Sequence, residues 1–342
     1  MSRTFAKHPM ADERFLILRM SALGDIVHTL PAVAALRQSF PRAQIDWLVD
    51  SKWSPILEGN PDATKIISID RRNWRKVLAT IRQLRATRYT IALDFQSLYR
   101  SAILARLSGA SRRVGFDASY AREGAAAFVY TEKVMPRRLH KVEHNIELVE
   151  SAGAHVNDIR FWLPTSREGR EHVDRVLAAH GINDFFVLSP GGGWASKCWP
   201  AERYGALHGA LVERYGWRGV ISFGPGERNL AEIVRREAAS PEPLVELFDL
   251  PQLIALLRRA KFLVAADTGP LHLASSLGTP VVGLYGPTDP TRNGPFSKHD
   301  VVVRNASAAE TTYRRDKTPA PSMLSITVEQ VLDAIARRLK TP

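Results

Sequence analysis

The sequence predicts an α/β protein of two doubly wound domains, each built on a parallel sheet with helices on both faces. Short, continuously apolar runs alternate with segments of helical length, as is typical of parallel strands covered on both sides. The chain has 342 residues, more than the size at which a single core usually stops growing. The alternation also restarts after residue 164. We therefore expect domains at 14–164 and 165–325, and a closing helix at 326–342 that packs back towards the first domain.

In the first domain, apolar runs indicate strands and apolar residues at helical spacing indicate helices. Strands are expected at 14–20, 45–49, 65–69, 90–95 and 114–116, the last of them at the edge of the sheet. Helices are expected at 26–40, 54–58, 74–86, 101–107 and 141–152. Residues 1–13 are expected to form a disordered lead segment.

The second domain repeats the alternation, and both domains carry glycine-rich turns at strand ends. Strands are expected at 185–189, 219–223, 244–247, 262–266 and 281–285. Helices are expected at 167–180, 201–215, 229–238, 250–259, 270–277 and 327–339. Residues 305–322 lack periodicity and predict a loop. Two such domains with strand ends facing each other imply a cleft, which is where we expect substrates to bind.

Composition places the protein among globular proteins of a reducing compartment. Apolar residues make up 45% of the chain and charged residues 24%. No apolar run approaches the roughly 20 residues needed to cross a bilayer, and the polar start is not followed by a signal-peptide core. A single cysteine, Cys198, excludes an internal disulfide and a cysteine-based metal cluster. We expect a cytoplasmic protein.

The chain is strongly basic, with a formal net charge of +12 and a pI near 10.0. The surplus is concentrated in the first half, above all between residues 71 and 141. Such a balance suits nucleic acid, an anionic membrane surface or a phosphorylated substrate, and by itself it does not choose among them.

The strongest functional signal lies between a buried strand and a short helix, at Asp267-Thr268-Gly269. Asp267 can accept hydrogen bonds from sugar hydroxyls, while Thr268, Gly269 and the free N–H groups that open the helix present positive partial charge to a phosphate. His272 lies in the first turn, where it can also reach a ligand. The alternative is that Asp267 and Thr268 only cap the helix.

A second signal is the glycine-rich loop at 190–200, which contains Gly191, Gly192, Gly193 and Lys197. Its N–H groups are open to a phosphate, and the lysine adds a point charge. The spacing matches neither a Walker A loop nor a dinucleotide fingerprint, so the glycines alone are equally consistent with a tight turn. Glu227 follows Gly-Pro-Gly at another strand end, where acids bind ribose diols; a helix cap is the alternative.

The candidate general base is Asp25, which follows the first strand and starts the next helix. It is expected to meet a donor held by the second domain only when the domains close. The alternative is a carboxylate that merely stabilises the helix N-terminus. No metal site is expected, because no Asp-x-Asp pair lies in a suitable loop and the ten histidines are scattered.

Three motifs in this order resemble the lipopolysaccharide heptosyltransferases, glycosyltransferase family 9. They are Met20-Ser-Ala-Leu-Gly-Asp-Ile-Val-His-Thr-Leu-Pro31, Pro190-Gly-Gly-Gly-Trp-Ala-Ser-Lys-Cys-Trp-Pro200, and Asp267-Thr-Gly-Pro-Leu-His272 with Tyr285-Gly-Pro-Thr-Asp289. The resemblance implies a GT-B fold, an ADP-heptose donor, an acceptor on the inner core of lipopolysaccharide (Kdo-lipid A or its heptosylated form), and no metal.

The resemblance also implies residue roles. Asp25 matches the proposed base and Lys197 a lysine on donor phosphate and sugar, so these two are the predicted catalytic residues. The remaining predicted donor-binding residues are Gly192, Gly193, Glu227, Asp267, Thr268, Gly269 and His272. The predicted acceptor-binding residues are Ser21, Arg100, Arg122 and His144. The chain departs from the family at Gly192 and Gly193, where relatives have hydroxyl side chains, and at His144, where relatives have an arginine.

The mechanism so implied is an inverting, metal-free displacement in a monomeric enzyme at the inner face of the cytoplasmic membrane, whose anionic lipids suit the basic first domain. Two other classes remain open from the residues. One is another nucleotide-sugar enzyme such as a 2-epimerase, which needs no lipid acceptor. The other is a non-catalytic protein that binds an anionic ligand or nucleic acid, although the aromatic residues form no recognisable nucleic-acid motif.

Overall fold

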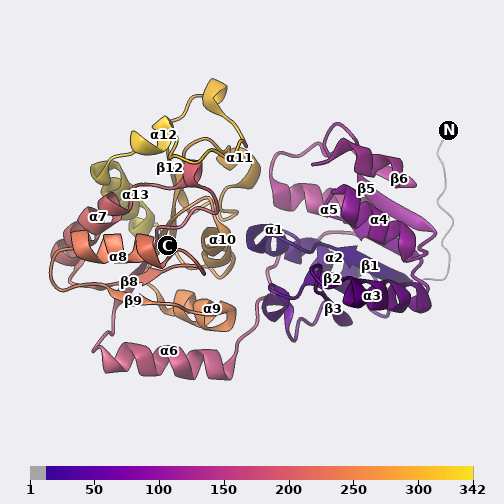
Figure 1. Ribbon diagram of the computed structural model, residues 1–342, viewed down its shortest axis with the longest axis horizontal. Coiled ribbons are helices and arrows are strands. Elements are labelled where there is room, and N and C mark those ends of the chain that lie inside the picture. The colour runs from indigo at the N-terminus through magenta and orange to yellow at the C-terminus, as the bar shows by residue number, and fades with distance from the viewer. Residues whose placement is uncertain (1–12, 342) are drawn as a thin grey trace. The chain divides into compact units, whose positions relative to one another are not determined.

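The computed structural model describes residues 13–341 and divides the chain into two compact units, Met1–Trp162 (unit 1) and Leu163–Pro342 (unit 2) (Figure 1). The sequence predicted the division after residue 164. Apart from residue 13, the predicted lead segment at 1–13 lies outside the described residues. Among the described residues, no helix is both long enough and apolar enough to span a bilayer.

Unit 1 is built on a six-stranded parallel sheet in the order β3-β2-β1-β4-β5-β6. Its strands are β1 Arg14–Leu18, β2 Gln44–Asp50, β3 Lys65–Ile69, β4 Ile91–Asp94, β5 Arg112–Phe116 and β6 Glu132–Val134. Its helices are α1 Leu23–Val27, α2 Leu30–Ser39, η1 Ser54–Leu57, α3 Trp74–Thr87, α4 Tyr99–Leu107, η2 Gly124–Phe128 and α5 Lys141–Ser151. Helices α2 and α5 contact each other, as do α3 and α4.

Unit 2 repeats the arrangement with a six-stranded parallel sheet in the order β12-β11-β10-β7-β8-β9. Its strands are β7 Phe185–Ser189, β8 Arg218–Ser222, β9 Leu244–Glu246, β10 Leu263–Ala266, β11 Val281–Tyr285 and β12 Val301–Arg304. Its helices are α6 Arg167–Ala179, η3 Ala195–Lys197, α7 Ala201–Tyr215, α8 Arg228–Glu237, α9 Leu250–Arg259, α10 Gly269–Ser276, α11 Pro290–Asn293, η4 Ala308–Glu310, α12 Pro321–Leu324 and α13 Val328–Lys340.

Each sheet has a point at which the strand order reverses. The chain builds three strands to one side and then returns to the centre, so β1 lies beside β4 in unit 1 and β7 lies beside β10 in unit 2. In sheets of this kind, ligands bind beyond the carboxyl ends of the strands at this reversal. The loops after these four strands carry most of the predicted site residues.

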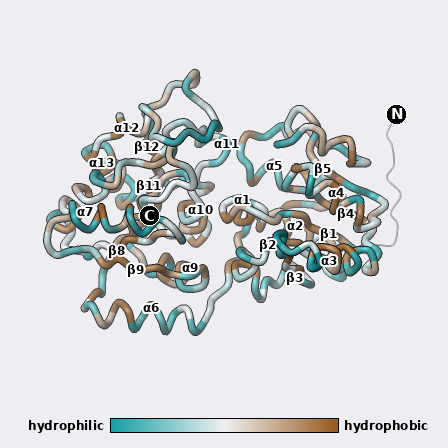
Figure 2. The backbone as a smooth tube through the Cα atoms, in the orientation of Figure 1, coloured by the Kyte–Doolittle hydropathy of each residue, from teal (hydrophilic) through white to brown (hydrophobic). Residues whose placement is uncertain are grey.

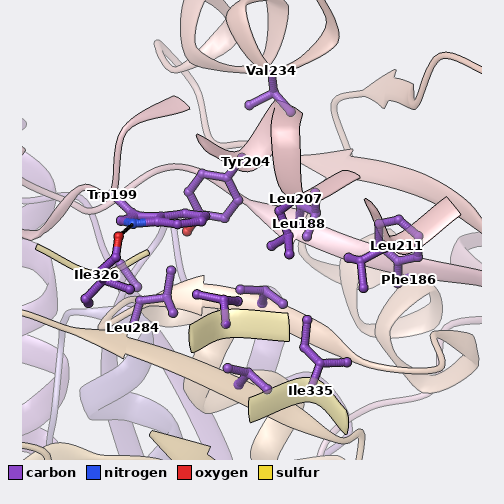
Figure 3. Packing of buried hydrophobic residues seen from close by; sticks show 14 of the residues in the cluster. Phe186, Leu188, Trp199, Tyr204, Leu207, Leu211, Val234, Leu284, Ile326 and Ile335 are labelled. Carbon is purple, nitrogen blue, oxygen red and sulfur yellow. Dashed lines mark hydrogen bonds between the residues drawn. The ribbon is translucent and has the colours of Figure 1, made fainter. Parts of the chain in front are cut away.

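The apolar face of the closing helix α13 lies in the core of unit 2, and the predicted packing of this helix towards the first domain stays a prediction. Ile335 packs in the same buried cluster as Leu284 of β11 and Leu207 of α7 (Figure 3). Just before α13, the carbonyl of Ile326 accepts a hydrogen bond of 2.9 Å from the indole N–H of Trp199, drawn as a dashed line in Figure 3. The sequence pattern shows that one face of a helix is apolar but does not say which core receives it.

Helix α6 is amphipathic, as the hydropathy colouring of Figure 2 shows. This helix alternates between hydrophilic and hydrophobic residues, and its buried members, Gly169, Val173 and Leu177, recur at intervals of four. Spacing of this kind places one stripe of the helix against its neighbour, which here is α9. The strands, in contrast, are apolar on both faces, as in the fully buried β7.

The structure differs from the sequence predictions at several boundaries. The helix predicted at 26–40 is two helices, because Pro31 has no N–H and its ring conflicts with the carbonyl four residues earlier, at Val27, where α1 ends. Strand β5 is not at the sheet edge, since β6 pairs with it. Strand β12 and the short helices η2, α11, η4 and α12 were not predicted.

Candidate active site

The loops after β7 and β10 bring the predicted donor-binding residues of unit 2 together around Asp267. The Lys197 ammonium lies 3.2 Å from Oδ2 of Asp267 and also donates to the backbone carbonyl of Asp267. Oδ1 accepts from Nε2 of His272 at 3.2 Å, and Oδ2 accepts from the side-chain amide of Asn293 at 3.0 Å. Lys197 is 7% exposed, Asp267 5% and His272 6%. The cluster is therefore a buried network in which one carboxylate holds three donors.

Asp267 is ionised throughout the physiological pH range. Burial raises the pKa of its carboxyl, but the hydrogen bond from His272 and the charge of Lys197 outweigh burial and lower the pKa to about 2. Its negative charge in turn adds to the effect of burial in raising the pKa of Tyr285. Because its oxygens already accept hydrogen bonds from these partners, the Asp267 carboxylate has a positioning role for Lys197 and His272 in addition to any role in binding a ligand.

The opening of α10 carries no side-chain cap, which excludes the simplest alternative for this motif. Thr268 occupies the N-cap position, but its hydroxyl donates back to the carbonyl of Ala266 at 3.1 Å. The carboxylate of Asp267 bonds to His272, Lys197 and Asn293 rather than to the helix amides. No side chain of the described residues therefore neutralises the positive end of the α10 dipole, which lies beside Lys197. Free helix amides next to a lysine ammonium suit a phosphate.

The glycine-rich loop packs against Glu227. A Cβ on Gly191 would lie 2.3 Å from both carboxylate oxygens of Glu227, so only glycine permits this approach. Gly193 has a φ of +73°, in the left-handed region that favours glycine, and a Cβ on Gly192 would meet the sulfur of Cys198 at 2.6 Å. The glycines therefore shape the loop, in addition to any role in binding.

Glu227 is not a side-chain cap, which was the alternative for this residue. Its carboxylate accepts a hydrogen bond of 2.8 Å from the N–H of Gly224, the first residue of the turn, while no side chain caps α8. Burial, followed by the charge of Glu227, raises the pKa of Cys198. The 190–200 loop thus connects Glu227 with the network around Asp267.

In unit 1, Asp25 lies in the first turn of α1 and interacts with the buried Arg19. One carboxylate oxygen lies 3.9 Å from Arg19 Nη1 and accepts from the N–H of Ala22 at 3.4 Å. Burial raises the pKa of Asp25, but the charges of Arg19 and Lys141 outweigh it, so the pKa is lowered. With a side chain that is 31% exposed, Asp25 is an ionised carboxylate that can accept a proton.

The predicted acceptor-binding residues do not all gather at one place. Ser21 lies beside Asp25, and its N–H donates to the side chain of Gln96 after β4. Arg122 is exposed, and its charge contributes to lowering the pKa of Asp25. Arg100 is exposed on α4, and among the described residues no hydrogen bond or ion pair joins it to Asp25.

His144 lies inside unit 1 rather than on its surface. The side chain is 3% exposed; Nε2 donates to the carbonyl of Arg138 at 2.7 Å, and Nδ1 accepts from the hydroxyl of Tyr120. Both ring nitrogens are therefore occupied by the protein, and this geometry does not support direct contact between His144 and an acceptor. The arrangement suits a residue that positions the segment around Tyr120, two residues before Arg122.

Several residues of these networks were missed by sequence reasoning. Arg19 had a signal, since it is a charge at the end of an apolar strand. Asp94 is the last residue of β4 and Gln96 follows the strand; the side chain of Gln96 ties this loop to the backbone of Met20 at 2.9 Å. Asn293, on the four-residue α11, carried no signal in the sequence. Among residues 13–341, no group of three or more histidine, cysteine, aspartate and glutamate side chains is arranged to hold a metal ion.

The chain is an α/β protein with two doubly wound units. In unit 2, a buried lysine–aspartate pair lies beside a glycine-rich loop and an uncapped helix. These features are typical of the class of proteins that binds phosphorylated ligands at strand ends. The family model of glycosyltransferase family 9 (heptosyltransferase) matches residues 77–322. The chain therefore belongs to this family and is a glycosyltransferase.

Individual relatives agree with the family assignment. The chain is 31% identical to lipopolysaccharide heptosyltransferase 1 of Pseudomonas aeruginosa over 84% of its length and 82% of the relative's. It matches the structure of Escherichia coli heptosyltransferase WaaC with ADP at a TM-score of 0.71 and 27% identity, covering 95% of this chain and 99% of that one. A family 9 structure from Veillonella parvula aligns at a TM-score of 0.84 and 23% identity, covering 96% and 97%, and supports the GT-B fold alone.

Asp267→Asn is expected to lower the free energy of unfolding at pH 7 by about 3–5 kcal/mol, because it leaves the buried Lys197 ammonium without its charged partner. Because the pKa is lowered on folding, the stabilisation is present above the unfolded value near 3.9 and is lost as the pH falls through about 2. Urea denaturation at several pH values measures both effects.

The matched control is Asp249→Asn, because Asp249 caps α9 from an exposed position and asparagine caps a helix equally well. This control is expected to change stability by less than about 0.5 kcal/mol. Equal losses in the two variants would contradict the role given to the buried pair.

Proposed function

We propose that the protein transfers heptose from ADP-heptose to the inner core of lipopolysaccharide, by an inverting displacement that uses no metal ion. The observation that carries the proposal is the buried Lys197–Asp267 pair beside the uncapped opening of α10, at the strand reversal of unit 2. The Escherichia coli relative WaaC has been solved with ADP and with ADP-2-deoxy-2-fluoro heptose, which supports this donor class for a chain of the same family.

In the proposed donor complex, the diphosphate lies against the amides of Thr268 and Gly269 and beside the ammonium of Lys197. These groups are fixed before the ligand arrives, so they stabilise phosphate charge without reorganising. Glu227 accepts from the adenosine ribose diol, and the flat surface of Gly192 and Gly193 admits the nucleotide. Asp267 and His272 hold Lys197 in place and border the heptose.

In the proposed reaction, the Asp25 carboxylate takes the proton of an acceptor hydroxyl as its oxygen bonds to the anomeric carbon. The bond from that carbon to the β-phosphate oxygen breaks, and its electron pair leaves with ADP. Lys197 and the opening of α10 stabilise the charge that develops on the leaving group. A single displacement from the face opposite the leaving group inverts the anomeric configuration. Arg19 keeps Asp25 ionised and oriented before the acceptor binds.

The acceptor is anionic, and exposed basic residues of unit 1 suit it. Arg122 is one candidate, because its charge already helps to lower the pKa of Asp25. Ser21 adjoins the base, and Arg100 is a second exposed guanidinium on the same unit. His144 contributes by positioning the Tyr120 segment that precedes Arg122.

We also propose that unit 1 binds the anionic inner leaflet through α3, α4 and η2. These helices contain no aspartate or glutamate, and they contribute the exposed basic residues Arg75, Lys76, Arg82, Arg85, Arg100 and Arg106. They also expose large apolar side chains: Trp74 at 66%, Leu78 at 43%, Tyr99 at 51% and Phe128 at 87%. Helix α4 contacts both α3 and η2. Exposed apolar side chains among basic ones fit an anionic bilayer surface.

Asp25→Asn is expected to slow acceptor-dependent ADP release by about 10²–10⁴-fold, because it removes the proton acceptor while keeping the shape of the side chain. The assay uses ADP-heptose with Kdo-bearing lipid A and no added metal. Asp70→Asn, a change at an exposed ion pair with Lys76, is the matched control and should leave the rate unchanged.

Calorimetry measures the affinity of Asp25→Asn for ADP, which should equal that of the wild type. Retained affinity shows that a loss of activity does not come from a loss of donor binding. Full activity in the variant would overturn the role of Asp25. A wild-type protein that binds ADP but turns over neither substrate would point to another sugar or acceptor, and one that binds no ADP would refute the proposed function.

The double variant Arg82→Glu/Arg85→Glu is expected to weaken binding to phosphatidylglycerol vesicles by tenfold or more, since each basic residue near an anionic surface is worth about 1 kcal/mol. Arg235→Glu/Arg236→Glu on α8 makes the same charge change in unit 2 and should have little effect. Co-sedimentation at low and high salt measures this. Equal losses in both variants, or equal binding to neutral vesicles, would contradict the assigned surface.

A further inference from the structure

The segment between β12 and α12 lies along the glycine-rich loop. The N–H of Thr312 donates to the carbonyl of Pro287 at 2.8 Å, and the N–H of Ala320 donates to the carbonyl of Ser196 at 3.2 Å. Between these points, the carbonyl of Arg314 accepts a longer hydrogen bond of 3.4 Å from the Ser196 hydroxyl. Residues 311–320 (the strap) are thus fastened at both ends to loops that surround the Asp267 network.

The strap brings a second cation to the indole ring that Lys197 already contacts. The Lys197 ammonium lies 4.1 Å from the ring centroid of Trp194, and the guanidinium carbon of Arg315 lies 4.9 Å from the same centroid. The two charges are therefore separated by no more than the sum of these distances. Trp194 belongs to the glycine-rich loop, and its own N–H is buried without a hydrogen-bond partner among the described residues.

Arg315 differs from Arg314 in having no carboxylate of the described residues to neutralise it. Arg314 pairs with Asp316 at 3.6 Å, and this aspartate is the single acidic residue of the strap. In the described part of the chain, no aspartate or glutamate lies within ion-pair distance of Arg315, although its side chain is exposed and the ring contact holds it in place. Asp267 already neutralises Lys197, whereas the charge of Arg315 has no such partner within residues 13–341 and is available to an anionic ligand bound beside Trp194.

We propose that Arg315 is a donor-binding residue that contacts the diphosphate of the nucleotide sugar together with Lys197. The planar guanidinium can donate two parallel hydrogen bonds to a phosphoryl group, whereas the ammonium of Lys197 acts as a point charge. A nucleoside diphosphate carries two phosphoryl groups, enough to engage both cations. The stacking on Trp194 fixes the guanidinium before the ligand binds, which reduces the entropy lost on binding. The inference rests on the function proposed above and extends it to a residue outside the predicted site.

The experiment compares Arg315→Gln with the matched variant Arg314→Gln, which changes the neighbouring arginine. Isothermal titration calorimetry measures the affinity of each protein for ADP and for adenosine, which lacks the phosphates. We expect Arg315→Gln to bind ADP about tenfold or more weakly and adenosine as the wild type does, because a charge-assisted hydrogen bond is lost. Arg314→Gln is expected to bind both ligands normally, and neither variant should change the melting temperature.

Three results would overturn the inference. Unchanged ADP affinity in Arg315→Gln, with wild-type protein that binds ADP, would refute the contact and leave the proposed function intact. Equal weakening for ADP and adenosine would show that Arg315 supports the strap and does not contact the diphosphate. A wild-type protein that binds no ADP would refute the proposed function and the inference with it.

Discussion

The buried pair of Lys197 and Asp267 is the interaction on which the proposed donor site depends. Placing a lysine ammonium in a site that is almost closed to water is unfavourable unless a carboxylate and further hydrogen bonds compensate. Asp267 provides the carboxylate, and His272 and Asn293 hold that carboxylate in turn. The result is a positive group of fixed position beside the opening of α10. In the proposed mechanism, such a group stabilises a departing diphosphate without having to move.

The same topology serves a different chemistry in each unit. At the reversal in unit 2, the loops after β7 and β10 gather positive charge from Lys197 and the helix amides. At the reversal in unit 1, the ionised carboxylate of Asp25 lies beside Arg19. The side chain of Gln96, after β4, accepts hydrogen bonds from the N–H groups of Met20 and Ser21, after β1, and so holds the two loops together. One sheet architecture thus presents a cationic group in one unit and an ionised carboxylate in the other. The proposed mechanism uses the first to stabilise the leaving group and the second to accept the acceptor's proton.

Much of the fold followed from the sequence, because its main elements have strong local patterns. The bounds predicted for β7, α7 and α9 agree with the structure, since continuous apolar runs or regular helical spacing mark these segments. Strand β6 was missed because Glu132-Lys133-Val134 is short and charged, and it is a strand only by pairing with β5. The place of α13 in the core of unit 2 was not predicted, because an apolar helix face does not identify the core that receives it.

Site residues that belong to a local sequence motif could be predicted. Site residues that reach the site only through a tertiary contact could not. Asp267 and Lys197 lie in glycine-rich turns at strand ends, so their positions could be inferred from local sequence. Asn293 and Arg315 reach the same region from a four-residue helix and an aperiodic segment, and only the folded chain brings them there. His144 shows the opposite case: its match to a position where relatives have an arginine suggested a ligand contact, but both ring nitrogens are bound within the protein.

The most direct test of the central claim is a crystal structure of the protein with ADP. The account predicts that the β-phosphate lies within hydrogen-bond distance of the Lys197 ammonium and the N–H of Gly269, with the ribose at Glu227. A nucleotide bound elsewhere, or one whose phosphates avoid Lys197 and the opening of α10, would contradict the claim that this buried pair organises the donor site.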